Sequence, residues 1–499
     1  MAALTPSPPA SATPLHFQGA AQLARRIAAG DISSRALLEA MLARVAKYNP
    51  ALNAIILLRA DEARARADAA DAAQAAGQSW GPLHGVPMTV KECFDWTGTP
   101  STFGHPERAT HRARHDAAVI ERLEAAGAIV FGKTNVPKDL SDWQSFNAVY
   151  GVTVNPWNAA HSPGGSSGGS AAALAAGLTA LEVGSDVGGS IRVPAHFSGV
   201  YGHRPTYGIV PVRGHALTEG APPDDINVVG PLARTPEDLD LAMRLLAGAD
   251  GPQARGWKLD LPEAKHATLS GWRVALVTGD PDYPVDTDTR DAVLAVADTL
   301  RRAGASVTLD PALPLPSREY HELYIALLRG STAGRRSAKE IAAMKSQAAA
   351  LAPEDHGYEA LMLRGLTQDH REWLEQNARR TRLRADWEAF FGRYDLLVTP
   401  MTPTPAFPHI HDTPKPAQRL MVDGVSMPMS NTYFWIGLSA VAYLPATVIP
   451  AGQSRVGSTA GLPIGLQVLG PEYGDLSCIA LARQLETAHR GFQPPPGYD

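Results

Sequence analysis

The chain has 499 residues, of which 44% are hydrophobic and 19% charged, and its formal net charge is -5. This balance leaves no basic surplus or stripe for a nucleic-acid partner. Its two cysteines, Cys93 and Cys478, exclude a Cys-rich metal site and make a disulfide framework unexpected, so a reducing cytoplasm is the expected location. No apolar run approaches the ~20 residues that a membrane span needs.

The chain begins with a Pro- and Ser-containing stretch, residues 1–16, that lacks the charged and apolar regions of a signal peptide. We expect a disordered tail there and a single domain over 17–499. Two helices are predicted between residues 18 and 47, joined at "AAGDISS", where Gly30 suits a helix end and Ser33 or Ser34 a helix start. A short strand, "NAIILL", follows them.

Brief apolar runs then alternate with turn residues and helical stretches, first at 86–92, 128–134 and 180–186. The second half continues with runs at 272–279, 305–310, 394–400, 446–452 and 462–470. This alternation is typical of a layered α/β domain with a buried central sheet. Residues 317–391 have long helical stretches without a strand pattern, which predicts a helical insert that caps the sheet.

Two glycine-rich turns carry serines, "SPGGSSGGS" (162–170) and "GSDVGGSIRVP" (184–194). A flexible linker would also be rich in Gly and Ser, but these turns adjoin apolar sequence that forms elements, so we interpret them as tight turns. Adjacent glycines allow consecutive backbone amides to point into one small space, as an oxyanion hole requires. Ser190, presented by the second turn, is therefore a candidate nucleophile.

A serine nucleophile needs a base, and the segment "GPLHGVPMTVKE" (81–92) offers two, His84 and Lys91. A lysine at a buried strand end loses hydration, so its pKa falls and its neutral amine can accept a proton. Pairing of Lys91 with Glu92 is an equally good interpretation on spacing alone. Ser166, in the first turn, could pass the proton between amine and nucleophile, and Ser170 fits a helix N-cap.

Two other patterns point to chemistry that we do not expect. "GAIVFGKT" (127–134) matches a phosphate loop as a string, but its four middle residues are apolar strand formers rather than a loop. "HIHD" (409–412) offers two histidines in a Pro-rich segment without a third ligand. We therefore predict neither a nucleotide nor a metal site.

Together these motifs resemble the amidase signature family of serine hydrolases. The family pattern is matched by "GVPMTVK" (85–91), "GGSSGGS" (164–170) and "GSDVGGSIRVP" (184–194). The similarity is strong over residues 20–245 and weak in the C-terminal half. It implies an α/β/α sandwich around a large mixed β-sheet, with no metal or organic cofactor.

Carried over by position, the resemblance makes Ser190 the nucleophile, Ser166 the bridging serine after a cis peptide bond, and Lys91 the base. It assigns the oxyanion hole to the amides of Val187, Gly188, Gly189 and Ser190. The substrate-binding residues that we expect are Leu140, Trp143, Gly165 and Tyr433.

The activity expected from this resemblance is hydrolysis of C–N acyl bonds in amides, anilides and aryl carbamates by a monomer or homodimer. The aromatics of "TYFWIG" (432–437) and Leu444, where many family members have glycine, favour bulky apolar substrates. One alternative is the glutamine-hydrolysing subunit of an aminoacyl-tRNA amidotransferase, which shares the family core but needs partner chains. A second alternative is a binding protein that has lost catalysis.

Overall fold

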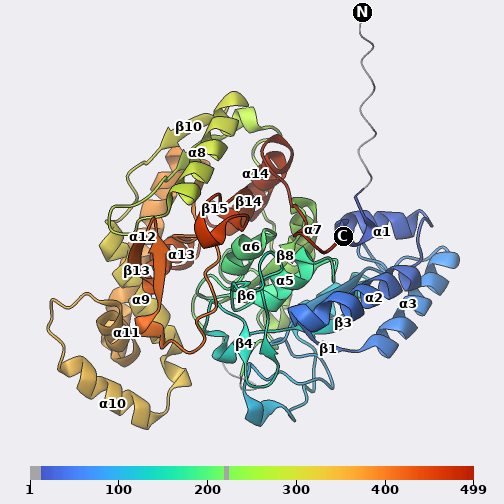
Figure 1. Cartoon of the computed structure of the whole chain (residues 1–499), viewed down its shortest axis with the longest axis horizontal. Coiled ribbons are helices and arrows are strands. Elements are labelled where there is room, and N and C mark those ends of the chain that lie inside the picture. The colour runs from blue at the N-terminus through green and yellow to red at the C-terminus, as the bar shows by residue number, and fades with distance from the viewer. Residues whose placement is uncertain (1–12, 218–223) are drawn as a thin grey trace, which may run out of the picture.

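The computed structural model describes residues 13–217 and 224–499 (Figure 1). Most of the tail predicted at 1–16 lies outside these residues, but a 3-10 turn at Leu15–Phe17 begins before that stretch ends. The predicted helix pair is confirmed as α1 (Ala20–Ala28) and α2 (Ser34–Leu52). Ser33 caps α2, because its hydroxyl accepts the Ala36 amide at 3.0 Å.

The centre of the molecule is an eight-stranded sheet in the order β10-β9-β11-β15-β14-β7-β8-β6. Its strands are β6 (Glu182–Asp186), β7 (Tyr201–Arg204), β8 (Val228–Ala233), β9 (Arg273–Leu276), β10 (Ser306–Leu309), β11 (Leu396–Pro400), β14 (Ala446–Gln453) and β15 (Pro463–Leu469). β9 pairs in parallel with β10 and β11, and the remaining pairs are antiparallel. The sheet is therefore mixed, and the α/β fold class is confirmed.

Successive residues of the strands point to two different hydrophobic cores. Val274 and Leu276 of β9 belong to one core and Ala275 between them to the other, as the two-residue period of a strand requires. The first core is covered by α7 (Pro236–Leu246), α8 (Thr287–Arg302) and α14 (Asp475–Ala488). The second is covered by α6 (Arg192–Ser198), α9 (Ser317–Thr332) and α13 (Thr432–Ala440). Helices therefore cover both faces of the sheet.

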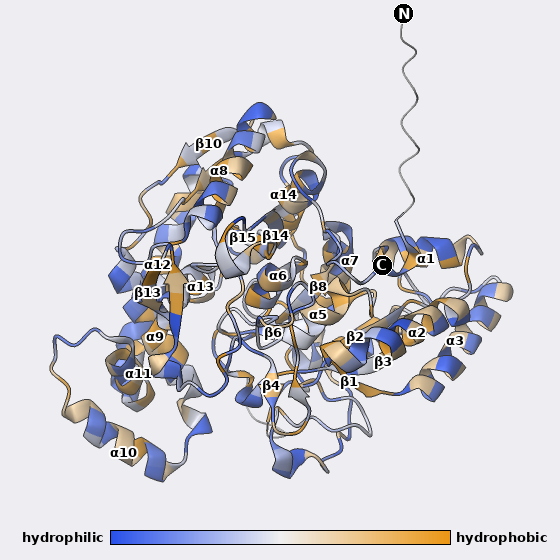
Figure 2. Ribbon diagram, in the orientation of Figure 1, coloured by the Kyte–Doolittle hydropathy of each residue, from blue (hydrophilic) through white to orange (hydrophobic). Residues whose placement is uncertain are grey.

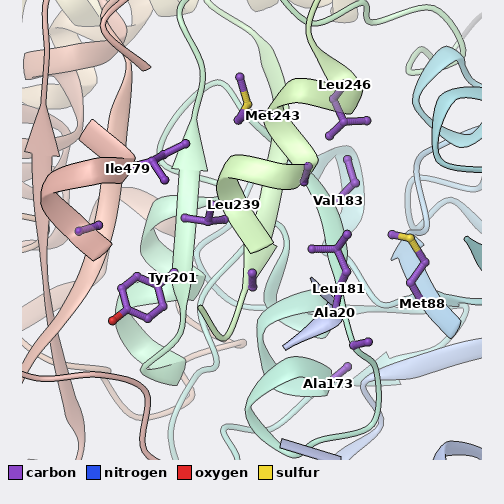
Figure 3. Close-up of a cluster of buried hydrophobic side chains, with 14 of the residues drawn as sticks. Ala20, Met88, Ala173, Leu181, Val183, Tyr201, Leu239, Met243, Leu246 and Ile479 are labelled. Atoms are coloured by element: carbon purple, nitrogen blue, oxygen red, sulfur yellow. The ribbon is translucent and has the colours of Figure 1, made fainter. Parts of the chain in front are cut away.

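Figure 3 shows part of the first core, where the inner side of α7 faces β6 and β7. Leu239 and Met243 of α7 are fully buried there. Their neighbours in the view include Leu181, Val183, Tyr201 and Ile479. Figure 2 shows the corresponding polar surface, with hydrophilic residues spread over the outer helices.

The strands at 86–92 and 128–134 do not join the central sheet. They are β2 (Pro87–Lys91) and β3 (Ile129–Thr134), which form a separate sheet with β1 (Ile55–Leu58) in the order β1-β3-β2. The Thr89 amide of β2 donates to the Thr179 hydroxyl, and the Thr89 hydroxyl donates to the Glu182 carboxylate. Side chains thus take the place of a backbone ladder between β2 and β6. The strand β3 also confirms that "GAIVFGKT" is no phosphate loop.

The insert consists of α9, α10 (Ala338–Ala349), α11 (Tyr358–Thr367) and α12 (His370–Arg393), with no strand among its described residues. α9 and α12 contribute buried residues to the second core, whereas α10 has none and projects from the body (Figure 1). A hairpin of β12 (Arg419–Val422) and β13 (Val425–Pro428) follows it. The remaining elements are α3 (Ala60–Ala75), α4 (Ala118–Ala125), α5 (Gly168–Ala175), β4 (Phe146–Asn147) and β5 (Gly151–Val152). No helix within the described ranges combines the length and apolarity that a bilayer-spanning segment requires.

Leu239→Ala should lower the free energy of unfolding by about 2–5 kcal/mol, because it leaves a cavity between α7 and the sheet. Leu374→Ala on α12 is the matched control, because the Leu374 side chain is 48% exposed. Urea denaturation followed by circular dichroism measures both variants. Equal losses for the two would contradict the assignment of α7 to the core.

Candidate active site

The turn that presents Ser190 is held from below by a buried carboxylate. Asp186, the last residue of β6, accepts the Gly189 amide at 2.9 Å and the Ile191 amide at 3.2 Å. It also pairs with the guanidinium groups of Arg192 at 3.0 Å and Arg204 at 3.2 Å, all fully buried. Burial alone would raise the pKa of Asp186, but the two arginines hold it well below its ordinary range. This ion cluster fixes the backbone on both sides of Ser190.

The turn leaves backbone amides available for a substrate oxygen. Because the Gly189 amide donates to Asp186, the oxyanion-hole proposal depends on Val187, Gly188 and Ser190. The amides of these three make no hydrogen bond within the described part of the chain. Gly189 itself has φ +85°, and a Cβ there would lie 2.8 Å from Ile436, so the position requires glycine.

The first glycine-rich turn lies directly against the second. The Gly165–Ser166 peptide bond is cis, as the family resemblance implies. The Ser167 amide donates to the Ser190 carbonyl at 3.1 Å and joins the two turns. The N-cap interpretation of Ser170 is wrong, because α5 begins two residues earlier and the Ser170 hydroxyl instead lies 2.9 Å from that of Thr134.

Lys91 is the last residue of β2 and is fully buried. Its Nζ donates to the Ser166 hydroxyl at 2.7 Å and to the Ser185 hydroxyl at 2.9 Å. Burial lowers the pKa of Lys91 from 10.5 to about 8. The alternative pairing with Glu92 is not observed, since the Glu92 carboxylate accepts the amides of Thr102 and Phe103 instead.

A second buried lysine shows what distinguishes Lys91. Burial also lowers the pKa of Lys133 to about 8. Its Nζ, however, donates to the carbonyls of Glu92 and Pro100 at 3.2 and 2.7 Å, and carbonyls can only accept. The two hydroxyl partners of Lys91 can also donate, and so they are compatible with a neutral amine. Lys91 is therefore better suited than Lys133 to exchange a proton.

Histidines do not offer a competing site. His84 lies near the Trp80 amide and the Ala70 carbonyl, at 3.0 and 3.1 Å, and is 5% exposed. His409 and His411 of "HIHD" have ring centroids 4.8 Å apart. Within residues 13–217 and 224–499, no group of three His, Cys, Asp or Glu side chains is arranged to hold a metal ion.

The Ser190 hydroxyl is the remaining member of the predicted set. It makes no hydrogen bond to a described residue, and it lines a pocket together with Val187 and Gly188. The structure therefore brings Lys91 and Ser166 into contact and places Ser190 beside them in the adjoining turn. The hydrogen bond from Ser190 to Ser166 stays a prediction for the substrate complex.

Of the predicted substrate-binding residues, Leu140, Trp143 and Tyr433 line this pocket. The Trp143 indole donates to the Gly188 carbonyl at 2.9 Å, and its ring lies 4.7 Å from that of Tyr433. Gly165 is not in the pocket lining. A Cβ there would lie 2.2 Å from the Asp142 carbonyl, so this glycine allows the loop that carries Trp143 to approach the first turn.

The other aromatics of "TYFWIG" and Leu444 belong to the second core rather than to the pocket. Phe434, Trp435 and Leu444 are each no more than 1% exposed. Because α13 turns by about 100° per residue, Tyr433 faces the pocket while its two successors face the core. The sequence interpretation of these residues as substrate contacts applies to Tyr433 alone.

Sequence reasoning missed several residues that shape the site. Ser185 is a partner of Lys91, and its place within "GSDVGGSIR" was the available signal. Arg329 and Tyr358 of the insert line the pocket, together with Lys415. No local pattern marks these three, because their positions depend on contacts between distant segments.

A mixed sheet that carries two serine turns, a buried lysine and an enclosed pocket defines a hydrolase of the acyl-transfer class. A family model described as Amidase matches residues 36–479, and the chain belongs to this family, with the amidase signature fold.

Three similar proteins illustrate its range. A glutamyl-tRNA(Gln) amidotransferase subunit of Anaeromyxobacter sp. (strain K) is 34% identical, over 94% of this chain and 96% of its own. The structure of a bacterial aryl acylamidase has a TM-score of 0.78 at 25% identity and covers 95% of this chain and 97% of its own. That of 6-aminohexanoate cyclic dimer hydrolase has a TM-score of 0.76 at 25% identity, over 96% of this chain and 99% of its own.

The rate of amide hydrolysis should rise with pH and reach half its maximum near pH 8, because only the neutral form of Lys91 accepts a proton. EDTA should leave the rate unchanged. A profile of kcat/KM from pH 6 to 10 on a neutral anilide measures this. A half-maximum near 6.5, or loss of activity with EDTA, would point to a histidine or a metal instead.

Proposed function

We propose that this chain hydrolyses C–N acyl bonds in amides, anilides and aryl carbamates through an acyl-enzyme on Ser190. The observation that carries the proposal is the 2.7 Å contact between Lys91 Nζ and Ser166 Oγ, in a buried position next to the Ser190 turn. The proposal needs no metal or organic cofactor. Membership in the amidase family supports it.

In the proposed reaction, neutral Lys91 takes the proton of the Ser166 hydroxyl, and Ser166 takes that of Ser190. The Ser190 oxygen attacks the acyl carbon, and the amides of Val187, Gly188 and Ser190 stabilise the negative charge on the carbonyl oxygen. The proton returns through Ser166 to the leaving nitrogen as the C–N bond breaks. Water then attacks the Ser190 ester, gives up its proton by the same route, and releases the acid.

Replacement of the three proposed catalytic residues should give an unequal series. Ser190→Ala removes the nucleophile and should be the most damaging, while Ser166→Ala and Lys91→Ala should each lower kcat/KM by about 10² or more. Ser167→Ala is a matched control, because its hydroxyl is buried without a described partner. Near wild-type kcat/KM for Ser166→Ala would remove the relay.

The pocket walls favour bulky apolar or aryl substrates over small polar amides. Trp143, Tyr433, Leu140, Leu328 and Met429 line the space next to Ser190. Burial of an aryl ring against them contributes about 25 cal/mol per Å², which outweighs one lost hydrogen bond.

We therefore expect 4-nitroacetanilide and a 4-nitrophenyl carbamate to have higher kcat/KM than acetamide or glutamine. Steady-state kinetics on the four compounds, with Ser190→Ala as the blank, measures the preference. A higher value for either small amide would overturn the substrate class and leave the mechanism in place.

A second candidate function is that of a glutamine-hydrolysing subunit of an aminoacyl-tRNA amidotransferase. It is favoured by curated relatives of that description at 32–34% identity, which match 94–95% of this chain. An enzyme of this kind works with partner subunits, so the purified chain alone should then be inactive on anilides. Activity on anilides without a partner would favour the first proposal.

The third alternative, a silent binding protein, is tested by a fluorophosphonate probe. This reagent should label the wild-type chain and leave Ser190→Ala unlabelled. Absence of label from both would favour the binding protein.

A further inference from the structure

The pocket next to Ser190 is lined by three cationic side chains, Arg329, Arg335 and Lys415. Two of them have acidic partners. Arg335 forms a salt bridge with Asp224, and Lys415 lies 3.8 Å from Asp142. Among the described residues, no carboxylate lies within 4.0 Å of the Arg329 guanidinium. Arg329 is therefore the pocket cation whose charge no fixed carboxylate balances.

Two tyrosines hold this guanidinium in place. Arg329 Nη2 donates to the phenol oxygens of Tyr433, at 2.9 Å, and Tyr358. Its central carbon lies 5.4 Å from the Tyr433 ring centroid and 5.6 Å from that of Tyr358. The two rings stack on each other at 5.4 Å. They come from α11 and α13, which both pack on α9 (Figure 1).

This arrangement positions Arg329 without using its hydrogen-bonding capacity. A guanidinium has five N–H donors, and only those of Nη2 have partners among the described residues. Its Nε is buried and unpartnered. A buried cation of this kind gains most from an anion, and a carboxylate fits its planar donors in pairs.

Arg329 is also close to the reacting centre. The Tyr433 ring that holds it is in contact with the nucleophile turn, since a Cβ on Gly188 would lie 3.8 Å from Tyr433 Cε1. One tyrosine ring thus separates the guanidinium from the proposed oxyanion hole. Because a C–C bond is ~1.5 Å long, a linker of about three to five atoms would cover that separation.

We propose that Arg329, held by Tyr358 and Tyr433, binds a carboxylate of the substrate, so that the pocket selects amides bearing an acidic group a few atoms from the scissile carbonyl. This inference rests on the proposed amide hydrolysis. It adds a charged subsite to the apolar walls of the same pocket. The carboxylate can belong to the acyl part or to the leaving amine, and the probes below separate the two.

The test compares anilides that differ by one carboxylate. N-glutaryl-4-nitroanilide places the acid on the acyl side, and N-butyryl-4-nitroanilide is its neutral counterpart. N-acetyl-4-aminobenzoate places the acid on the amine side, with acetanilide as its counterpart. We expect the wild-type chain to favour one acidic probe over its counterpart by about 10-fold or more in kcat/KM, as a charge-assisted hydrogen bond predicts.

Arg329→Gln should bring that ratio close to one, and Arg329→Lys should leave an intermediate ratio because it keeps the charge and loses the paired donors. Arg336→Gln is the matched control, because Arg336 lies outside the pocket lining and its side chain is 48% exposed. It should keep the wild-type ratio. Wild-type ratios at or below one for both pairs, or a ratio that Arg329→Gln does not change, would overturn the inference.

A binding measurement keeps the inference testable without turnover or a folded variant. Titration calorimetry on the wild-type chain compares glutarate with 1,5-pentanediol, and 4-aminobenzoate with aniline. One acid should bind at least about 10-fold more tightly than its neutral counterpart, and equal binding of both pairs would overturn the carboxylate site. If neither anilide is hydrolysed and one acid still binds preferentially, amide hydrolysis fails while the carboxylate site stands.

Discussion

The site depends on one buried carboxylate and the two arginines that neutralise it. Asp186 accepts amides from both sides of the Ser190 turn while Arg192 and Arg204 compensate its charge in the interior. Removing one partner of such a cluster would leave an uncompensated buried charge, which is far more destabilising than the loss of one contact. Arg192 also donates to the Ile436 carbonyl of α13 at 3.1 Å. The same cluster therefore connects the nucleophile turn to the helix that carries Tyr433.

The second constraint is the removal of Lys91 from water. A lysine in solution is protonated at neutral pH and cannot act as a base. Its place at the end of β2, behind the first serine turn, lowers the pKa enough for a neutral fraction to exist near pH 8. Because β2 contacts β6 through side chains instead of a backbone ladder, space remains between the two sheets for the amine and its hydroxyl partners.

The sequence could predict the parts of this molecule that local chemistry determines. Lys91 ends an apolar strand, and Ser166 and Ser190 lie in turns that only glycine permits, so each position is marked by its neighbours. The sheet to which β2 belongs could not be predicted, because an apolar run indicates a strand but not its partner. For the same reason Tyr433 could not be separated from Phe434 and Trp435, since the phase of α13 is set by packing against α9.

The division between sheet and insert has a consequence for how such an enzyme can change. The reacting groups are anchored in strands and turns of the body, whereas Arg329 and Tyr358 come from helices α9 and α11, and α10 between them buries no residue. The outer part of the insert can therefore drift in sequence, lengthen or be exchanged without disturbing the groups that break the bond. Descendants of one ancestor could thus diverge in what they consume while they keep the same chemistry.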